Sequence, residues 1–331
     1  MTDVMHNFEL YQPGTVADAQ AILKDSDDPW IIAGGKDSLG WFKDRVKQPS
    51  EVVDIAGIEE LQGIREEDDG GLWIGALTTL TDIGASDVIK NRFPALSTAA
   101  DHVASPQIRN AGTIGGNVSQ DTRCGYYRDG FPCYRAGGNT CYANTPTAMN
   151  REHALFEASR CVAVTPSDTA PALAALEATF VIQGDGDRRD VSADDFFIGP
   201  DIDITRMTSL ERGDILLGIR IPGKWAGSNQ YFEKVSDRNV WDFALVNIAM
   251  AARMDGGTVS DVSMVCGGVQ CTPRHLSEVE DLMRGESPGS NLETLVKRVA
   301  ASGAQPLNFN HFKVPMMRNL AARAVRSLAA G

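Results

Sequence analysis

The stretch Arg109-Asn110-Ala111-Gly112-Thr113-Ile114-Gly115-Gly116-Asn117, with the cysteine-rich segment that follows it, decides how this chain is organised. We call residues 113–117 the glycine loop. Two glycines beside a hydroxyl and an amide side chain let the backbone come close to a ligand and offer N–H groups to an anion. Glycine pairs also occur in ordinary turns, so this loop alone leaves both interpretations open.

Four of the six cysteines gather in the next part of the chain, which we call the cysteine segment (residues 122–161). Their separations are eight, seven and nineteen residues, at Cys124, Cys133, Cys141 and Cys161. The segment has no Cys-x-x-Cys pair, which makes structural zinc a secondary alternative. Four thiolates in a loop with Pro132, Gly137 and Gly138 suit a four-iron four-sulfur cluster. Zinc and a structural or disulfide role stay open as alternatives.

A second glycine motif follows an apolar strand near the N-terminus. Trp30 to Ala33 read as the strand, which ends at Gly34-Gly35 and continues into Lys36-Asp37-Ser38. We call residues 33–38 the glycine turn. Its amides could hold a pyrophosphate, but the Gly-x-Gly-x-x-Gly pattern is missing. The sequence therefore disfavours an ordinary Rossmann fold.

Length and composition limit the classes of protein that the chain can belong to. With 331 residues it can form more than one core, and 43% apolar with 23% charged residues is typical of a globular protein. No apolar run approaches the roughly 20 residues that span a bilayer. The net charge of -13 makes nucleic acid a poor partner. Residues 1–7 show no export signal, so we expect a cytoplasmic chain, exported only as a passenger of a signal-bearing partner.

A domain boundary is predicted in the loop from Gly223 to Asn229, after a strand over Ile215 to Ile221. The residues beyond it suggest a small antiparallel sheet with helices on one face, ending in an amphipathic helix from about Pro315. Cys266 and Cys271 lie in this part, and we expect both to be small buried hydrophobic residues away from the cysteine segment. Cys161 is expected to open an apolar strand, Cys161 to Val164.

Several motifs in this order resemble the flavin subunit of the xanthine dehydrogenase family. The matching stretches are Ile32-Ala33-Gly34-Gly35, Ile108-Arg109-Asn110 with the glycine loop, Asp214-Ile215-Leu216-Leu217, Lys234 with Arg238 and Asp242, and Gly267-Gly268-Val269 before Thr272-Pro273-Arg274. Most members lack clustered cysteines. The cysteine segment resembles an inserted loop found in chains like the 4-hydroxybenzoyl-CoA reductase β subunit and in some bacterial aldehyde oxidoreductases, where it holds an extra four-iron four-sulfur cluster.

The resemblance implies an α/β FAD-binding domain of the vanillyl-alcohol-oxidase type followed by a small C-terminal α+β domain. We expect the first domain over residues 1–224, as two α/β subdomains with the cluster loop inserted at about 122–161, and the second over residues 229–331. It also implies an electron-transfer role. FAD in this chain would pass electrons between iron–sulfur centres and a soluble carrier, while a large molybdopterin subunit performs the substrate chemistry and a small subunit holds two two-iron two-sulfur clusters.

The resemblance also assigns the residues of the cofactor sites. No catalytic residue is expected in this chain. The FAD-binding residues would be Ala33, Gly34, Gly35, Lys36, Asp37, Ser38, Thr113, Gly115, Gly116, Asn117, Asp121, Ile215, Leu216 and Lys234. The glycine turn would bind the pyrophosphate, Ile215 and Leu216 would touch the isoalloxazine, and Lys234 would reach its polar edge. Cys124, Cys133, Cys141 and Cys161 would ligate the cluster. Two rivals remain, a stand-alone binding protein stabilised by zinc or disulfides and a self-sufficient FAD oxidase.

Overall fold

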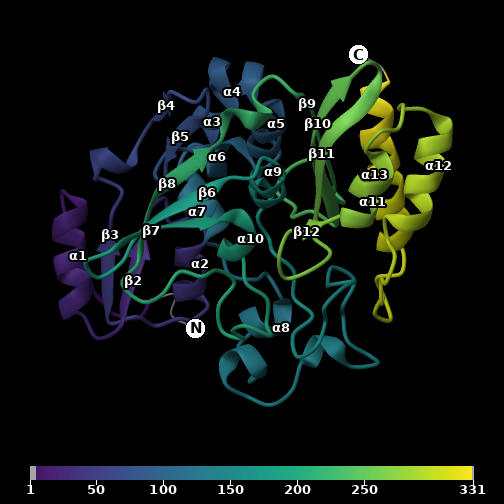
Figure 1. Ribbon diagram of the computed structural model, residues 1–331. Coiled ribbons are helices and arrows are strands. Elements are labelled where there is room, and N and C mark those ends of the chain that lie inside the picture. The colour runs from purple at the N-terminus through teal and green to yellow at the C-terminus, as the bar shows by residue number, and fades with distance from the viewer. Residues whose placement is uncertain (1–4, 330–331) are drawn as a thin grey trace.

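The computed structural model describes residues 5–329 and begins with a parallel sheet of three strands (Figure 1, purple). Its strands are β1 (Glu9–Tyr11), β2 (Pro29–Ile32) and β3 (Glu51–Asp54), in the order β1-β3-β2. Helix α1 (Val16–Asp25) connects the first two, and Thr15 Oγ1 accepts the Asp18 amide at 3.1 Å at its start. Strand β2 lies at the sheet edge. The glycine turn follows directly after β2 and therefore leaves the sheet at the carboxyl end of that strand.

The second sheet has five strands, and all neighbouring strands are antiparallel. In spatial order they are β4 (Ile64–Glu66), β5 (Leu72–Gly75), β8 (Ile215–Ile221), β6 (Thr179–Gln183) and β7 (Arg188–Ser192). Helices α5 (Pro94–Asp101) and α9 (Thr169–Ala175) share one buried apolar cluster with the sheet. The strand expected over Ile215 to Ile221 is confirmed, and it places Ile215 and Leu216 in the middle of the molecule.

Short helices occupy the connections around these two sheets. They are α2 (Ser38–Lys43), α3 (Leu80–Ala85), α4 (Asp87–Arg92), α6 (Pro106–Arg109), α7 (Ile114–Val118), α10 (Ala193–Phe196) and the 3₁₀ turns η1 (Glu59–Leu61) and η4 (Gly223–Trp225). The glycine turn leads into α2, and the glycine loop forms the first turns of α7 with Thr113 as its N-cap. Both glycine motifs are therefore strand-to-helix or loop-to-helix junctions.

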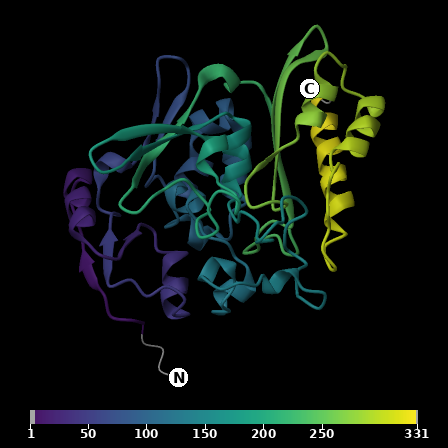
Figure 2. The ribbon, with the colours of Figure 1, turned by 60° about the horizontal axis from the view of Figure 1, so that its bottom comes forward.

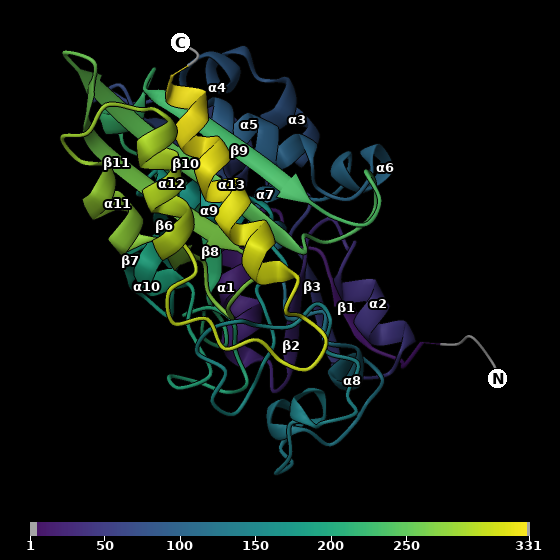
Figure 3. The same ribbon diagram turned by 90° about the vertical axis from the view of Figure 1, so that its right-hand side faces the viewer.

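The C-terminal part is an antiparallel sheet covered by helices on one face (Figure 3). Its strands lie in the order β12 (Arg274–His275), β11 (Thr258–Gly267), β10 (Val246–Asp255) and β9 (Asn229–Val235), under α11 (Ser277–Met283), α12 (Ser290–Val299) and α13 (Lys313–Leu328). This arrangement confirms the expected one, although α13 begins at Lys313 rather than at Pro315. Between residues 5 and 329, no helix combines the length and apolar character that a membrane crossing requires.

The cysteine segment lies at one end of the molecule, between α2 and the C-terminal part (Figure 2). It contains only α8 (Gly125–Arg128), η2 (Tyr134–Ala136) and η3 (Tyr142–Asn144). The predicted strand from Cys161 to Val164 is wrong. Cys161, Val162 and Ala163 are buried, but they form no strand ladder: the carbonyl of Val162 accepts the Ala154 amide at 2.8 Å, from an irregular segment. The apolar residues of this stretch correctly indicate burial, but they do not indicate a strand.

Candidate functional site

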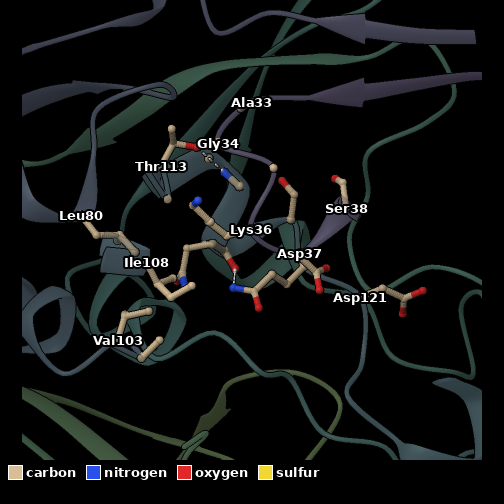
Figure 4. A pocket seen from close by; sticks show the side chains of 18 of the residues that line it. Ala33, Gly34, Lys36, Asp37, Ser38, Leu80, Val103, Ile108, Thr113 and Asp121 are labelled. Atoms are coloured by element: carbon tan, nitrogen blue, oxygen red, sulfur yellow. Dashed lines mark hydrogen bonds between the residues drawn. The ribbon is translucent and has the colours of Figure 1, made fainter. Parts of the chain in front are cut away.

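A cavity of about 760 Å³ lies where the two glycine motifs, β8 and the C-terminal part meet. Its wall includes nearly all the residues that the sequence predicted for FAD. They are Ala33, Gly34, Gly35, Lys36, Asp37, Ser38, Thr113, Gly115, Gly116, Asn117, Asp121, Ile215 and Leu216. Figure 4 shows Gly34 beside Thr113, with Asp37 and Asp121 further along the same wall. Residues far apart in the sequence therefore converge on one site.

The glycine turn and the glycine-loop region pack backbone against backbone. A Cβ added to Gly34 would lie 1.7 Å from the carbonyl oxygen of Ala111, so only glycine fits there. Gly35 has a φ of 69°, in the left-handed region that favours glycine. The first glycine thus joins the two motifs, and the second turns the chain along the cavity wall.

The two motifs differ in the backbone N–H groups that they offer to a ligand. In the glycine loop, the amide of Ile114 donates to Thr78, that of Gly115 to Ala76, and that of Gly116 to Thr113 Oγ1. The expectation that this loop offers free amides to an anion is therefore wrong for these three residues. Within residues 5–329, no protein acceptor takes the amides of residues 34–38. The glycine turn, with the exposed Lys36, is therefore the part of the wall that offers N–H groups and a positive charge to the cavity.

Asn117 is buried and fixed behind the cavity wall. Its Oδ1 accepts two hydroxyl groups, from Ser167 and from Thr169, each at 2.6 Å. Both hydroxyls belong to the start of α9, so the glycine loop is tied to the core of the second sheet. This contact sets the orientation of the Asn117 amide and holds the loop rigid.

Lys234 is the one predicted FAD residue that does not line the cavity. Its Nζ donates to Asp168 Oδ2 at 2.6 Å and to the His102 carbonyl at 2.9 Å, and both side chains of the ion pair are almost fully buried. Asp168 does line the cavity. Burial raises the pKa of the Asp168 carboxyl, while Lys234 and Asn247 act in the opposite direction. Lys234 therefore acts on the cavity only indirectly, through its ion pair with Asp168.

Sequence reasoning missed that the cysteine segment supports the cavity wall. Asp37 accepts hydrogen bonds from Arg123 at 2.8 Å, from Arg128 at 2.6 Å and from the Trp41 indole at 3.1 Å. The Arg128 guanidinium also lies 3.5 Å from the centre of the Trp41 ring. Nothing in the spacing of these residues indicates the contact, because 86 residues separate Arg123 from Asp37.

A second link joins the cavity to the cysteines. Asp121 lines the cavity and accepts a hydrogen bond from Arg135 Nη2 at 2.7 Å. The Arg135 side chain is 2% exposed, and its Nε and Nη1 have no hydrogen-bond partner in the described part of the chain. Buried donors without acceptors are costly, so two unpaired nitrogens of a buried cation, with three N–H groups between them, indicate a place for an anionic group.

Among residues 5–329, no three of the predicted cysteine ligands converge as the ligands of one metal ion do. Cys124 and Cys133 belong to one apolar cluster with Tyr127. The Cys124 thiol also lies close enough to Cys161 and Cys141 to interact electrostatically with both. Burial raises the pKa of Cys124 to about 11, and burial also raises the pKa of Cys141. All six cysteines of the chain are unpaired, so no disulfide forms.

Cys271 corrects one expectation and Cys266 confirms another. Cys266 is fully buried in the C-terminal core, away from the four cysteines. Cys271 packs against Cys161 and donates from its Sγ to the Ala163 carbonyl at 3.0 Å, so the expectation that it lies away from the cysteine segment is wrong. The neighbouring Cys271 thiol lowers the pKa of Cys161, against the effect of burial. The chain reversal after β11 brings Cys271 there.

The C-terminal loop also contributes to the cavity. Asp237, Trp241 and Phe243 line it with the previously noted Arg238 and Asp242. Trp241 has a φ of 76°, and its amide donates to the Ala104 carbonyl at 2.7 Å, which links the two parts of the chain at the cavity edge. A large residue with positive φ has no signature in the sequence, so this contribution could not be predicted.

The fold and the cavity define an α/β protein built around a large cofactor site, and comparison with known proteins assigns its family. Residues 6–224 match the family model "FAD binding domain in molybdopterin dehydrogenase", and residues 230–328 match "CO dehydrogenase flavoprotein C-terminal domain". The chain belongs to this family of FAD-binding medium subunits of molybdenum hydroxylases.

Individual relatives agree with this assignment. The chain is 34% identical to the carbon monoxide dehydrogenase medium chain of Hydrogenophaga pseudoflava, over 80% of this chain and 76% of the relative. It is 31% identical to the aldehyde oxidoreductase FAD-binding subunit PaoB of Escherichia coli K12, over 96% and 97%. A solved carbon monoxide dehydrogenase structure from H. pseudoflava superposes with a TM-score of 0.78 at 29% identity, covering 99% of both chains. The resemblance inferred from the motifs is confirmed at the level of the family.

Proposed function

We propose that this chain is the electron-transfer subunit of a molybdenum hydroxylase, with FAD in the 760 Å³ cavity and a four-iron four-sulfur cluster in the cysteine segment. The observation that carries the FAD assignment is the glycine turn, which presents unpaired amides and Lys36 to a cavity that also has an apolar part, with Ile215 and Leu216 in its wall. A pyrophosphate suits the turn, and a flat ring system suits the apolar part.

A second, smaller cavity adjoins the first and would give a dinucleotide more room. It shares Gly34 and Thr113 with the main cavity and continues past Thr79 and Asp82. Bound FAD supplies exchange between one-electron and two-electron carriers, while the protein holds and orients it. Ile215 and Leu216 would pack on the ring, and the buried pair of Lys234 and Asp168 would present a polar group to it.

One feature of the cysteine segment supports a cluster. The buried Arg135 interacts electrostatically with Cys161, and two of its nitrogens have no hydrogen-bond partner within residues 5–329. These N–H donors would meet the negative charge of a thiolate-ligated cluster. A cluster supplies one-electron transfer, and Cys124, Cys133, Cys141 and Cys161 would hold it.

The proposed partners follow from the relatives, which are named as medium chains or FAD-binding subunits. We expect a large molybdopterin-binding subunit, a small subunit with two two-iron two-sulfur clusters, and a soluble electron carrier. Cytoplasm is the proposed compartment, and it agrees with six unpaired thiols. The substrate is left to the large subunit, since the relatives' names range from carbon monoxide to aldehyde and nicotinate enzymes.

The test is to purify the tagged chain from its source and to measure FAD, iron, acid-labile sulfide and molybdenum. We expect one FAD, about four irons and four sulfides for this chain, with two partner subunits carrying the remaining metals. Single serine substitutions of Cys124, Cys133, Cys141 and Cys161 should degrade the cluster, and Cys266→Ser should leave it intact.

Cys271→Ser is the sharper control, because Cys271 is buried against Cys161 and yet is not a proposed ligand. If the cluster survives Cys161→Ser but not Cys271→Ser, the fourth ligand is Cys271 and not Cys161. A colourless chain with one zinc and no sulfide would refute the cluster, and a chain that oxidises an aldehyde alone would favour a self-sufficient oxidase.

A further inference from the structure

His153 is a buried imidazole that points at one of the proposed cluster ligands. Its Nε2 lies 3.3 Å from the Cys124 Sγ, and the residue is 8% exposed. Neither the glycine motifs nor the four cysteines require a histidine at this position. The following inference rests on the proposed cluster, since it concerns the environment of a cluster ligand.

The backbone of His153 is held in place from the C-terminal part of the chain. Its carbonyl accepts hydrogen bonds from Lys313 Nζ at 2.8 Å and from Asn310 Nδ2 at 3.0 Å. Both donors are completely buried at the start of α13, and Lys313 also donates to the Glu152 carbonyl at 3.2 Å. The imidazole therefore keeps its position relative to Cys124 with little freedom to turn away.

The surroundings of the ring also decide which nitrogen carries a proton. Nδ1 of His153 is buried and has no partner among the described residues. In the tautomer with the proton on Nδ1, that proton would be an unsatisfied buried donor. Nε2 would then be unprotonated, and its lone pair would face the sulfur of Cys124. A proton on Nε2 makes a hydrogen bond instead. In the imidazolium both nitrogens carry protons, so Nε2 donates to a Cys124 thiolate in either charge state.

We propose that His153 is a positioning residue that donates a hydrogen bond from Nε2 to the Cys124 thiolate and thereby raises the reduction potential of the cluster. Reduction adds one electron and no bond breaks, so the negative charge on the ligand sulfurs increases. A hydrogen bond to a ligand sulfur stabilises the more negative state more strongly. His153 thus favours acceptance of an electron at the end of the molecule where the cysteine segment is exposed.

The experiment is a reductive titration of the purified complex with dithionite, followed by electron paramagnetic resonance near liquid-helium temperature. The variants are His153→Ala, His153→Gln and, as a matched control, the exposed His311→Ala. In His153→Ala we expect four irons per chain but a roughly tenfold smaller equilibrium constant for reduction, which is about 59 mV for a one-electron couple. The Gln side chain offers an N–H at similar reach, so His153→Gln should recover most of the shift, and His311→Ala should show none.

The outcomes separate this inference from the proposed function. Wild-type protein without iron and sulfide would refute the cluster itself. A cluster whose potential is the same in wild type and His153→Ala would overturn only the role of His153. Loss of iron from both His153 variants would also overturn it, because the residue would then be needed to build the segment and not to set the potential.

Discussion

At the residue scale, Gly116 offers a test of the FAD site because a Cβ added there meets a single protein neighbour. A Cβ there would approach only Thr113 Oγ1, at 3.1 Å, whereas the rest of a side chain would enter the cavity. We expect Gly116→Val to weaken FAD binding roughly tenfold or more, with iron content unchanged. FAD titration of the deflavinated protein measures this. Gly57→Val is the control, since Gly57 is exposed with open space around it. Equal affinity in both variants would remove the glycine loop from the site.

His275 gives the protein a pH-dependent contact between its two parts. Its Nε2 lies 3.0 Å from Asp194 Oδ1 and its Nδ1 3.4 Å from Glu280 Oε1. Burial opposes the charge, but the two carboxylates raise the pKa of His275 to about 9. The resulting stability is fully present below the unfolded pKa of about 6.5 and is lost as the pH rises through 9.

We therefore expect His275→Gln to lower the free energy of unfolding by on the order of 2 kcal/mol at about pH 6, and by much less at about pH 9.5. Denaturant unfolding at the two pH values, with the exposed His311→Gln as reference, measures the difference. A loss of stability that is equal at both pH values would contradict the ion-pair account and indicate a packing effect.

At the scale of elements, the link between α8 and the glycine turn couples the two proposed cofactor sites. In the sequence, the FAD motifs and the cysteines occupy different stretches, which predicts that FAD binding survives loss of the cluster. The hydrogen bonds from Arg123 and Arg128 to Asp37 give a reason to expect otherwise, because these arginines flank Cys124 and hold a residue of the turn. If the cluster orders the cysteine segment, its loss frees both arginines.

We predict that Arg128→Gln weakens FAD binding roughly tenfold, since charge-assisted hydrogen bonds to a partly buried carboxylate contribute about 1.5–3 kcal/mol. Cys124→Ser should weaken FAD by a similar factor through the same contact. Arg326→Gln is the control, because Arg326 pairs with Glu293 on the distant helices α13 and α12. Unchanged FAD affinity in Arg128→Gln and Cys124→Ser would show that the sites are independent.

At the scale of the whole molecule, we expect a partner subunit to contact exposed apolar residues of the cysteine segment and of the chain just before α13. Met149 is 80% exposed, Phe309 56% and Phe131 38%. The three are connected through Tyr126, which packs on Phe131 and bonds the Met149 amide, and through Asn150, which bonds the Phe309 amide. Exposed apolar groups that adjoin one another mark interaction surfaces.

We expect Met149→Asp to reduce recovery of the partner subunits with the tagged chain several-fold, without changing FAD content. A buried charge in an interface is costly, whereas the same charge in water is not. Leu295→Asp, at an exposed apolar residue of α12, should leave the complex intact. Full recovery of the partners in Met149→Asp would place the contact elsewhere on the molecule.

The sequence by itself determined the family, the order of the two folding units and most of the cavity wall. Local signals carry this information: a glycine pair directly follows the apolar stretch that ends at Ala33, and the apolar residues of α13 recur at helical spacing. The four clustered cysteines predicted a common cluster site, and that assignment stays a prediction.

Only the tertiary structure decided which groups remain free and which are joined. The amides of residues 114–116 are used within the protein, Lys234 is bound by Asp168, and Cys271 reaches Cys161 across 109 residues of intervening chain. The same holds for Arg128 on Asp37 and for His153 on Cys124. Such contacts depend on how distant segments pack together, and a motif records only what its own residues can offer.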